Sequence, residues 1–171
     1  MSRVYVVDAG VLFSTWTMKV PYAHLITTNN IMVEVRNKPS KLRTEILLVL
    51  DRMQIIDPDV EYIQQTEKSA TLSGDKANLS DNDLELVALA LMLKAEGENV
   101  ILVSMDLAVL NTASHLNISF LDPSGRFEHE ITWVMSCPAC QYRSKTPSRD
   151  TDCPICGTTM KRTSLRKRKK T

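Results

Sequence analysis

The sequence has little that would suit an exported or membrane-bound protein. Its most apolar run, residues 86–93, is far shorter than the roughly 20 residues that span a bilayer. No secretory signal opens the sequence, so we expect a cytoplasmic protein with no membrane contact. Aromatic residues are also scarce, at 5%, and the core must therefore be built from aliphatic side chains and methionine.

Histidine and cysteine are few, and their positions limit the kinds of metal site that the chain could form. The three histidines, His24, His115 and His129, are scattered without the spacing of metal ligands, and we assign them no role. The four cysteines fall in two close pairs with none left over. In a reducing compartment this arrangement indicates a metal site rather than disulfides.

The two cysteine pairs have the spacing of a zinc site. Each is a Cys-x-x-Cys sequence, formed by Cys137 with Cys140 and by Cys153 with Cys156. Two intervening residues let both sulfurs face one ion, and four thiolates complete a tetrahedral shell with no open position. Thiolates also prefer a soft ion to Mg²⁺ or Ca²⁺. The spacing predicts one structural Zn²⁺, in a module too small to fold without it.

The net charge of +1 conceals an uneven distribution. Residues 1–130 carry 18 acidic and 11 basic side chains, whereas residues 131–171 carry 2 acidic and 10 basic ones. An acidic body with a basic end suggests nucleic acid as a partner of that end, although a solubilising tail would look the same.

Apolar periodicity predicts strands that alternate with helices. The expected strands are 3–7, 55–56, 100–103 and 118–121, and the expected helices are 29–37, 42–53, 61–72, 84–93 and 106–116. Ser80 and Asp83 form a capping-box pattern at the start of the most apolar helix. This alternation indicates an α/β fold whose central parallel sheet is flanked by helices.

Four acidic residues fall where such a fold binds ligands. Asp8 follows the first strand, and Asp106 follows the strand near residue 103. If these strands are neighbours, both acids lie at the carboxyl edge of the sheet, and Glu34 and Asp83 could complete a cluster for Mg²⁺ or Mn²⁺. Each acid also has a simpler interpretation: Asp83 and Asp106 can cap helices, and Glu34 can be a solvated surface residue.

Together these motifs resemble the PIN-domain nucleases. The resemblance is carried by the segments 6–12 (Val-Val-Asp-Ala-Gly-Val-Leu), 33–35 (Val-Glu-Val), 79–84 (Leu-Ser-Asp-Asn-Asp-Leu) and 103–106 (Val-Ser-Met-Asp). With a zinc ribbon added, the chain resembles more specifically the Nin-one-binding (NOB) endonucleases, which mature small-subunit rRNA. The resemblance implies Asp8, Glu34, Asp83 and Asp106 as catalytic acids that bind Mg²⁺ or Mn²⁺. It also implies cleavage of precursor small-subunit rRNA near its 3′ end, within the pre-ribosomal subunit and beside ribosome assembly factors.

We expect four segments along the chain: a PIN-like nuclease domain over 1–122, a linker over 123–134, a zinc ribbon over 135–162 and a disordered basic tail over 163–171. Because the predicted nuclease site is acidic, contacts to RNA phosphates should come from elsewhere. The candidates for these contacts are Arg143, Lys145, Arg149, Lys161 and Arg162.

Two other functions remain open at this stage. A toxin-type PIN ribonuclease would keep the fold and act on other RNAs, although the ribbon argues against it. A non-catalytic assembly factor would bind rRNA through the ribbon without cutting it, although the four acids argue against that reading.

Overall fold

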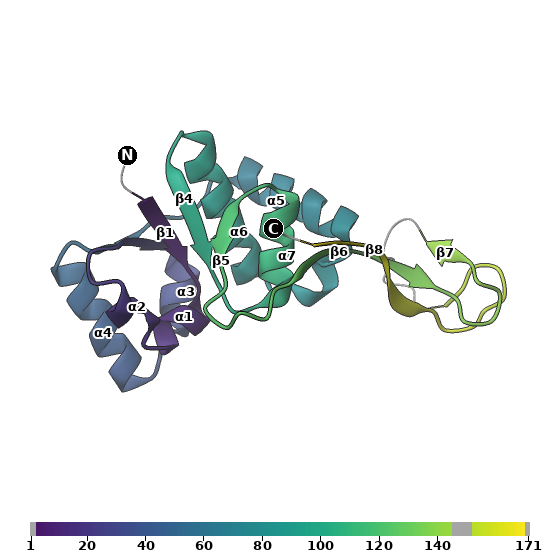
Figure 1. Ribbon diagram of the computed structural model, residues 1–171, viewed down its shortest axis with the longest axis horizontal. Coiled ribbons are helices and arrows are strands. Elements are labelled where there is room, and N and C mark those ends of the chain that lie inside the picture. Colours follow the sequence, from purple (N-terminus) through teal and green to yellow (C-terminus); the bar gives the residue numbers. More distant parts are fainter. Residues whose placement is uncertain (1–2, 145–151, 170–171) are drawn as a thin grey trace.

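The computed structural model describes residues 3–144 and 152–169. Its main body is an α/β layer structure built on a parallel sheet, and a second, antiparallel sheet extends from it (Figure 1). The fold class predicted from the sequence is thereby confirmed. Among the described helices, none has the length and apolar character needed to cross a membrane.

The body contains a five-stranded sheet in the order β3-β2-β1-β4-β5, with every neighbouring pair parallel. Its strands are β1 (Arg3–Val7), β2 (His24–Thr27), β3 (Met53–Ile55), β4 (Asn99–Val103) and β5 (Ser119–Leu121). The chain runs outward from β1 to β2 and β3, then returns to place β4 on the other side of β1. The order of strands therefore reverses between β1 and β4, which is where open parallel sheets bind ligands.

Helices of both halves of the chain flank this sheet (Figure 1). They are α1 (Ala9–Phe13), α2 (Trp16–Lys19), α3 (Asn29–Glu34), α4 (Lys38–Val49), α5 (Val60–Ser73), the 3-10 turn η1 (Lys76–Asn78), α6 (Asp81–Ala95) and α7 (Leu107–His115). Helix α6 is the central one, since eight of its side chains are buried. Full burial of a leucine such as Leu86 or Leu89 stabilises the fold by roughly 2 kcal/mol.

The second sheet forms what we call the arm, the described residues 129–144 and 152–169. It comprises β6 (His129–Ser136), β7 (Arg143–Ser144) and β8 (Lys161–Lys169), in the order β7-β6-β8. Strand β6 leaves the body and β8 runs back antiparallel to it, from Ser136 paired with Lys161 to His129 paired with Lys169. The two cysteine pairs lie at the far end of the arm (Figure 1).

The arm differs from the sequence prediction in two respects. Residues 163–169 were expected to be a disordered tail, but they belong to β8, because pairing with β6 satisfies the backbone groups along the strand. Residues 129–134 were expected to be part of a linker, but they form most of β6.

Candidate functional site

The structure brings Asp8 and Asp106 together at the carboxyl edge of the body sheet. Strands β1 and β4 are paired from Arg3 to Val7, so the residues that follow them are neighbours. Asp8 is joined to the end of β4 by a hydrogen bond from its backbone N–H to the Val103 carbonyl, 3.2 Å long. The convergence expected from the two strand ends is therefore observed.

A buried hydroxyl group connects these two acids. Ser104 follows β4 and is fully buried. Its Oγ donates to Asp8 Oδ2 at 2.8 Å and accepts from the backbone N–H of Asp106 at 3.0 Å. Sequence analysis did not single out Ser104, because a lone serine between a strand and an acid carries no distinctive pattern.

The electrostatic environment of Asp8 is unfavourable for a bare carboxylate. Burial raises the pKa of Asp8 above 3.8, and the hydrogen bond from Ser104 partly opposes that rise. The negative charges of Asp83 and Asp106 raise the pKa further. The charged form of Asp8 is therefore disfavoured unless a cation offsets its charge.

Asp83 and Asp106 both cap helices, and each keeps one carboxylate oxygen outside its cap. Asp83 Oδ2 accepts from the Ser80 backbone N–H at 2.9 Å and from the Ser80 hydroxyl at 2.7 Å, which completes the capping box of α6. Asp106 Oδ1 accepts from the backbone N–H groups of Ala108 and Val109 at the start of α7. The capping interpretation is thus correct for both, and it leaves Asp83 Oδ1 and Asp106 Oδ2 outside these caps.

Glu34 lies beside the start of α6. It is the last residue of α3, whereas the sequence predicted a helix that continues to residue 37. Its Oε1 accepts a hydrogen bond from the amide of Asn82, the neighbour of Asp83. Asn82 is a second positioning residue that sequence analysis did not identify.

These acids suit a hard divalent cation by their chemistry. Carboxylate oxygens are the ligands that Mg²⁺ and Mn²⁺ prefer. As the side chains stand, however, the four cysteines are the one group of potential ligands gathered tightly enough to hold an ion within the described residues. Asp8 lies within electrostatic reach of Asp83 and Asp106, and Glu34 contacts Asn82, but the four acids do not form so tight a set.

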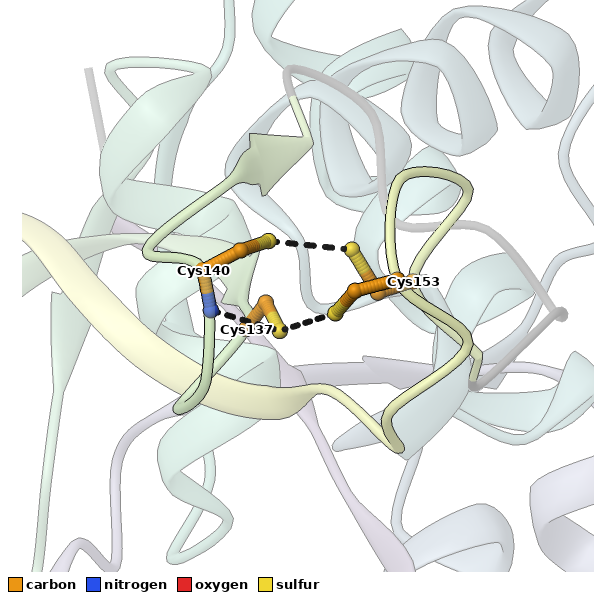
Figure 2. Close-up of side chains that lie close together, drawn as sticks. Cys137, Cys140 and Cys153 are labelled. Atoms are coloured by element: carbon orange, nitrogen blue, oxygen red, sulfur yellow. Dashed lines mark hydrogen bonds between the residues drawn. The ribbon is translucent and has the colours of Figure 1, made fainter.

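The four cysteines form a closely spaced sulfur cluster (Figure 2). The Sγ atoms of Cys137 and Cys156 are 3.5 Å apart, as are those of Cys140 and Cys153, and all four lie within 4.8 Å of one another. Zinc–sulfur bonds of about 2.3 Å would place tetrahedral sulfurs about 3.8 Å apart. The cluster therefore fits one metal ion, as the sequence predicted.

The two halves of this cluster repeat one local structure. The backbone N–H of Cys137 donates to the Tyr142 carbonyl, and that of Cys153 donates in the same way to Thr158. Each half also has one residue with positive φ, at Gln141 (62°) and Gly157 (72°). This shared loop explains why the same spacing occurs twice.

The basic residues proposed as RNA contacts are placed differently from one another. Arg143 and Lys161 are exposed on the arm. Arg162 instead contacts the body: its Nη2 donates to Asp75 Oδ1 at 2.8 Å and to the Gly74 carbonyl at 2.9 Å, and its guanidinium lies 4.1 Å from the centre of the Trp133 ring. Lys145 and Arg149 lie outside the described residues.

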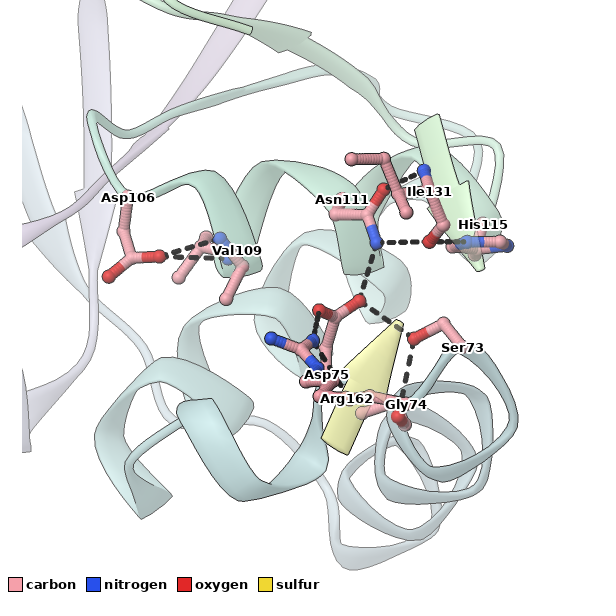
Figure 3. A network of polar contacts seen from close by, with 11 residues as sticks. Ser73, Gly74, Asp75, Asp106, Val109, Asn111, His115, Ile131 and Arg162 are labelled. Carbon is pink, nitrogen blue, oxygen red and sulfur yellow. Dashed lines mark hydrogen bonds and ion pairs between the residues drawn. The ribbon is translucent and has the colours of Figure 1, made fainter. Parts of the chain in front are cut away.

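Arg162 belongs to a polar network that joins the arm to the body (Figure 3). Asp75, only 2% exposed, also accepts from the Ser73 hydroxyl and the Asn111 amide. Asn111 in turn exchanges hydrogen bonds with the backbone of Ile131 on β6. This network could not be predicted from a local pattern, because its members are as far apart as 87 residues.

The parallel sheet and the acids at its switch point define a class, the metal-dependent nucleases of α/β fold. A sequence model of one such family, described as the PIN domain of ribonuclease, matches residues 5–93. The chain belongs to this PIN-domain ribonuclease family. It is therefore an endoribonuclease, and in this family the activity depends on a metal ion.

Three curated relatives are similar over most of the chain. Ribonuclease VapC1 of Thermoplasma acidophilum is 31% identical over 95% of this chain and 79% of its own length. Endoribonuclease Nob1 of Archaeoglobus fulgidus is 28% identical over 91% of this chain and 87% of its own. Endoribonuclease Nob1 of Methanocaldococcus jannaschii is 28% identical over 98% of this chain and 81% of its own length. The resemblance inferred from the motifs is confirmed.

Proposed function

We propose that this endoribonuclease cleaves precursor small-subunit rRNA near its 3′ end during ribosome maturation. The observation that carries the proposal is the similarity, over nearly the whole chain, to archaeal proteins named Endoribonuclease Nob1. In this proposal the nuclease domain spans 1–122 and the zinc ribbon 135–162. The substrate is presented within the pre-ribosomal small subunit, together with its assembly factors.

In the proposed site, Asp8, Glu34, Asp83 and Asp106 hold Mg²⁺ or Mn²⁺. The bound ion supplies charge neutralisation at the scissile phosphate and an activated water. Ser104 fixes the orientation of Asp8 and the backbone of Asp106, while Asn82 orients Glu34. The caps of α6 and α7 hold Asp83 and Asp106 in place, so that their remaining oxygens point in defined directions.

Cys137, Cys140, Cys153 and Cys156 hold a structural Zn²⁺, whose role is to maintain the end of the arm. The exposed Arg143 and Lys161 there provide contacts to RNA phosphates. Such contacts hold the substrate in a manner that weakens as salt rises and that carries little sequence information. Arg162 has the additional role of joining the arm to the body.

A second candidate is a PIN ribonuclease that acts on other RNAs. It is favoured by the similarity to the protein named Ribonuclease VapC1. That match covers 95% of the chain, so it extends over the region of the cysteine pairs as well as the body. Membership in a ribonuclease family argues against the non-catalytic assembly factor.

The test is cleavage of a labelled RNA that spans the 3′ end of small-subunit rRNA, with Mn²⁺ or Mg²⁺. We expect one discrete metal-dependent cut by the native chain and none by Asp8→Asn. Asp51→Asn is a matched control, since Asp51 is exposed before β3, at the opposite edge of the sheet. A cut at many unrelated sites, lost equally in Asp8→Asn, would favour the second candidate.

A further inference from the structure

A cavity of about 420 Å³ lies between the body and the base of the arm. Its lining comes from the first turns of α7, the segment around Arg126 and Phe127, strand β6 and Arg162 of β8. This volume falls within the range of pockets that hold small ligands. None of the roles assigned above makes use of this space.

The cavity begins directly beside the candidate nuclease site. Leu107 and Ala108, the two residues after Asp106, line it, and Asn111 lines it further along α7. At a rise of 1.5 Å per residue, Asn111 is about 7–8 Å beyond Asp106 along the helix. Figure 3 shows Asp106 at one end of α7 and the Asn111 network further along.

The lining has the chemistry that binds a single nucleotide. Phe127 and Trp133 supply aromatic rings, and Leu107 supplies an apolar side chain that is 45% exposed. Arg126 supplies a guanidinium group and Asn78 an amide, whereas the guanidinium of Arg162 is already bonded to Asp75. Asp75 and Glu128 are the acidic side chains of the lining. Single-stranded RNA is recognised by proteins that stack its bases on aromatic side chains or on guanidinium planes and bond their edges with polar groups.

Arg126 links this cavity to the nuclease site. Its Nη2 donates to the backbone carbonyl of Met105 at 2.7 Å, and its Nε donates to Ser124 Oγ at 3.0 Å. These two bonds leave Nη1 for a further acceptor. They also fix a positive charge beside a group of acids that would otherwise repel the phosphates of RNA.

The cavity is held in shape before any ligand binds. Asp122 accepts from the backbone N–H groups of Ser124, Arg126 and Phe127, which fixes the segment that carries the arginine and the phenylalanine. The Phe127 ring packs edge-on against Phe120, with centroids 5.0 Å apart. On the other side, the Asp75–Asn111 network fixes β6. A preformed site loses less entropy on binding.

We propose that this cavity binds one unstacked nucleotide of the RNA substrate, next to the phosphate that is cut. The base packs against Phe127 and Leu107, and Arg126 binds the phosphate between this nucleotide and the acids. The proposal rests on the endoribonuclease activity of the chain, but not on the identity of its natural RNA. It explains how a negatively charged site can hold RNA, which is also negatively charged, with one particular phosphate beside the acids.

The test compares RNAs that each lack a single base. A labelled oligonucleotide with the sequence at the 3′ end of small-subunit rRNA, and a series with one abasic site at each position, are bound to the full chain. Ca²⁺ replaces Mn²⁺, so that affinity is measured whether or not the RNA is cut. We expect one position to lose about tenfold in affinity when its base is removed, as loss of an aromatic stack does.

Phe127→Leu identifies the partner of that base. This variant keeps an apolar contact with Phe120 but loses the ring that packs against the base. It should therefore bind the intact RNA about tenfold more weakly, and its affinity should fall no further with the critical abasic RNA. Phe120→Leu is the matched control, because Phe120 belongs to the same ring pair but does not line the cavity. This variant should behave like the native chain. Thermal unfolding of both variants checks that they fold.

Two results would overturn the proposal: a uniform, small loss at every abasic position, or independent, additive losses from the abasic site and from Phe127→Leu. Failure of the native chain to bind this RNA would reject the proposed function instead, and the abasic series is then built on an RNA that the chain does cut. Cleavage in Mn²⁺ is scored separately, so a base-specific effect without the expected cut would leave the cavity assignment standing and reject the proposed function.

Discussion

Ser104 contacts Asp8 and Asp106 through a single atom, its hydroxyl oxygen. Replacing it with alanine removes the bond to Asp8 and the bond from Asp106 without changing charge. Because groups that orient metal ligands are worth 10–100-fold in metal affinity, we expect Ser104→Ala to need about tenfold more Mn²⁺ for half-maximal cleavage. A Mn²⁺ titration of the cleavage rate measures this.

Ser114→Ala is the control for that measurement. Ser114 is as buried as Ser104, and its hydroxyl donates to Glu130, which is not one of the four candidate metal ligands. An unchanged Mn²⁺ requirement in Ser104→Ala, or an equal change in both variants, would show that Ser104 does not position the acids.

The burial of Asp75 predicts that the free energy of unfolding depends on pH. Burial raises the pKa of Asp75 above 3.8, against hydrogen bonds from Asn111 and Ser73 and the charge of Arg162, which lower it. A raised pKa in the folded chain means that this carboxyl's contribution to stability is fully present below about pH 3.8 and is lost as the pH rises through the folded value. The neutral variant Asp75→Asn lacks this loss.

We therefore expect the difference in free energy of unfolding between the native chain and Asp75→Asn to move in favour of the variant as the pH rises from about 4 towards 7. Urea unfolding of both proteins at several pH values gives this difference. A shift in the opposite direction would mean that the ion pair with Arg162 outweighs burial.

Single residues were predictable from the sequence where their position along the chain reveals their role. Asp8 and Asp106 follow neighbouring strands, so their convergence could be predicted from the topology. Ser104 and Asn82 form hydrogen bonds with residues of other segments, and no local sequence pattern predicts such bonds. Arg162 was predicted as a contact to RNA, but the structure shows it paired with Asp75, 87 residues away. Such distant pairing is set by the fold.

At the scale of elements, Gly74 is the point where α5 meets the arm. It has φ of +82°, and a Cβ atom there would lie 2.7 Å from Trp133 Cβ and 2.8 Å from the Trp133 carbonyl oxygen. Gly74→Ala should therefore cost about 3 kcal/mol of unfolding free energy, from backbone strain plus the displacement of β6. Chemical denaturation measures this cost.

Gly97→Ala separates the two causes. Gly97 has φ of +90°, but nothing lies within 4 Å of the added Cβ atom. This variant should lose only about 1 kcal/mol, the cost of the backbone conformation alone. Equal losses at both positions would show that the contact between Gly74 and Trp133 contributes nothing.

Elements with a strong apolar pattern were predicted well, and short ones were missed. The strand 3–7 and the helix that became α6 were both recovered, because their apolar residues are continuous. Strand β2 has only four residues and was overlooked, although its Leu25 and Ile26 are buried. The helix expected over 29–37 ends at Glu34 as α3, and Pro39 lies in the first turn of the next helix, α4, where proline is tolerated. Strand β8 was missed because a run of basic residues resembles a solvated tail.

For the whole molecule, the arm and the body should respond differently to loss of metal. The apolar cluster at the end of the arm consists of Cys137, Cys153 and Met160 with Met135 beside them, whereas the body has a large core of its own. A structural zinc contributes on the order of 10 kcal/mol to such small modules. Chelation should therefore unfold the end of the arm and leave the body folded.

Amide hydrogen exchange measures this difference. After chelation, residues 137–144 and 152–160 should exchange rapidly, while the amides of α6 keep their protection. Cys140→Ser should have the same effect without a chelator, and added Zn²⁺ should restore only the native chain. Simultaneous loss of protection in α6 would mean that the two parts unfold as one unit.

The return of β8 along β6 has a mechanical consequence. A module on a single covalent tether can swivel, but one carried on two strands paired over eight positions, and anchored by Arg162 on Asp75, bends and twists far less. At about 3.4 Å per residue, the nine residues of β8 make a spacer of about 30 Å. In the proposed function, where the end of the arm binds the RNA then sets, through this fixed distance, which phosphodiester bond reaches the acids of the body.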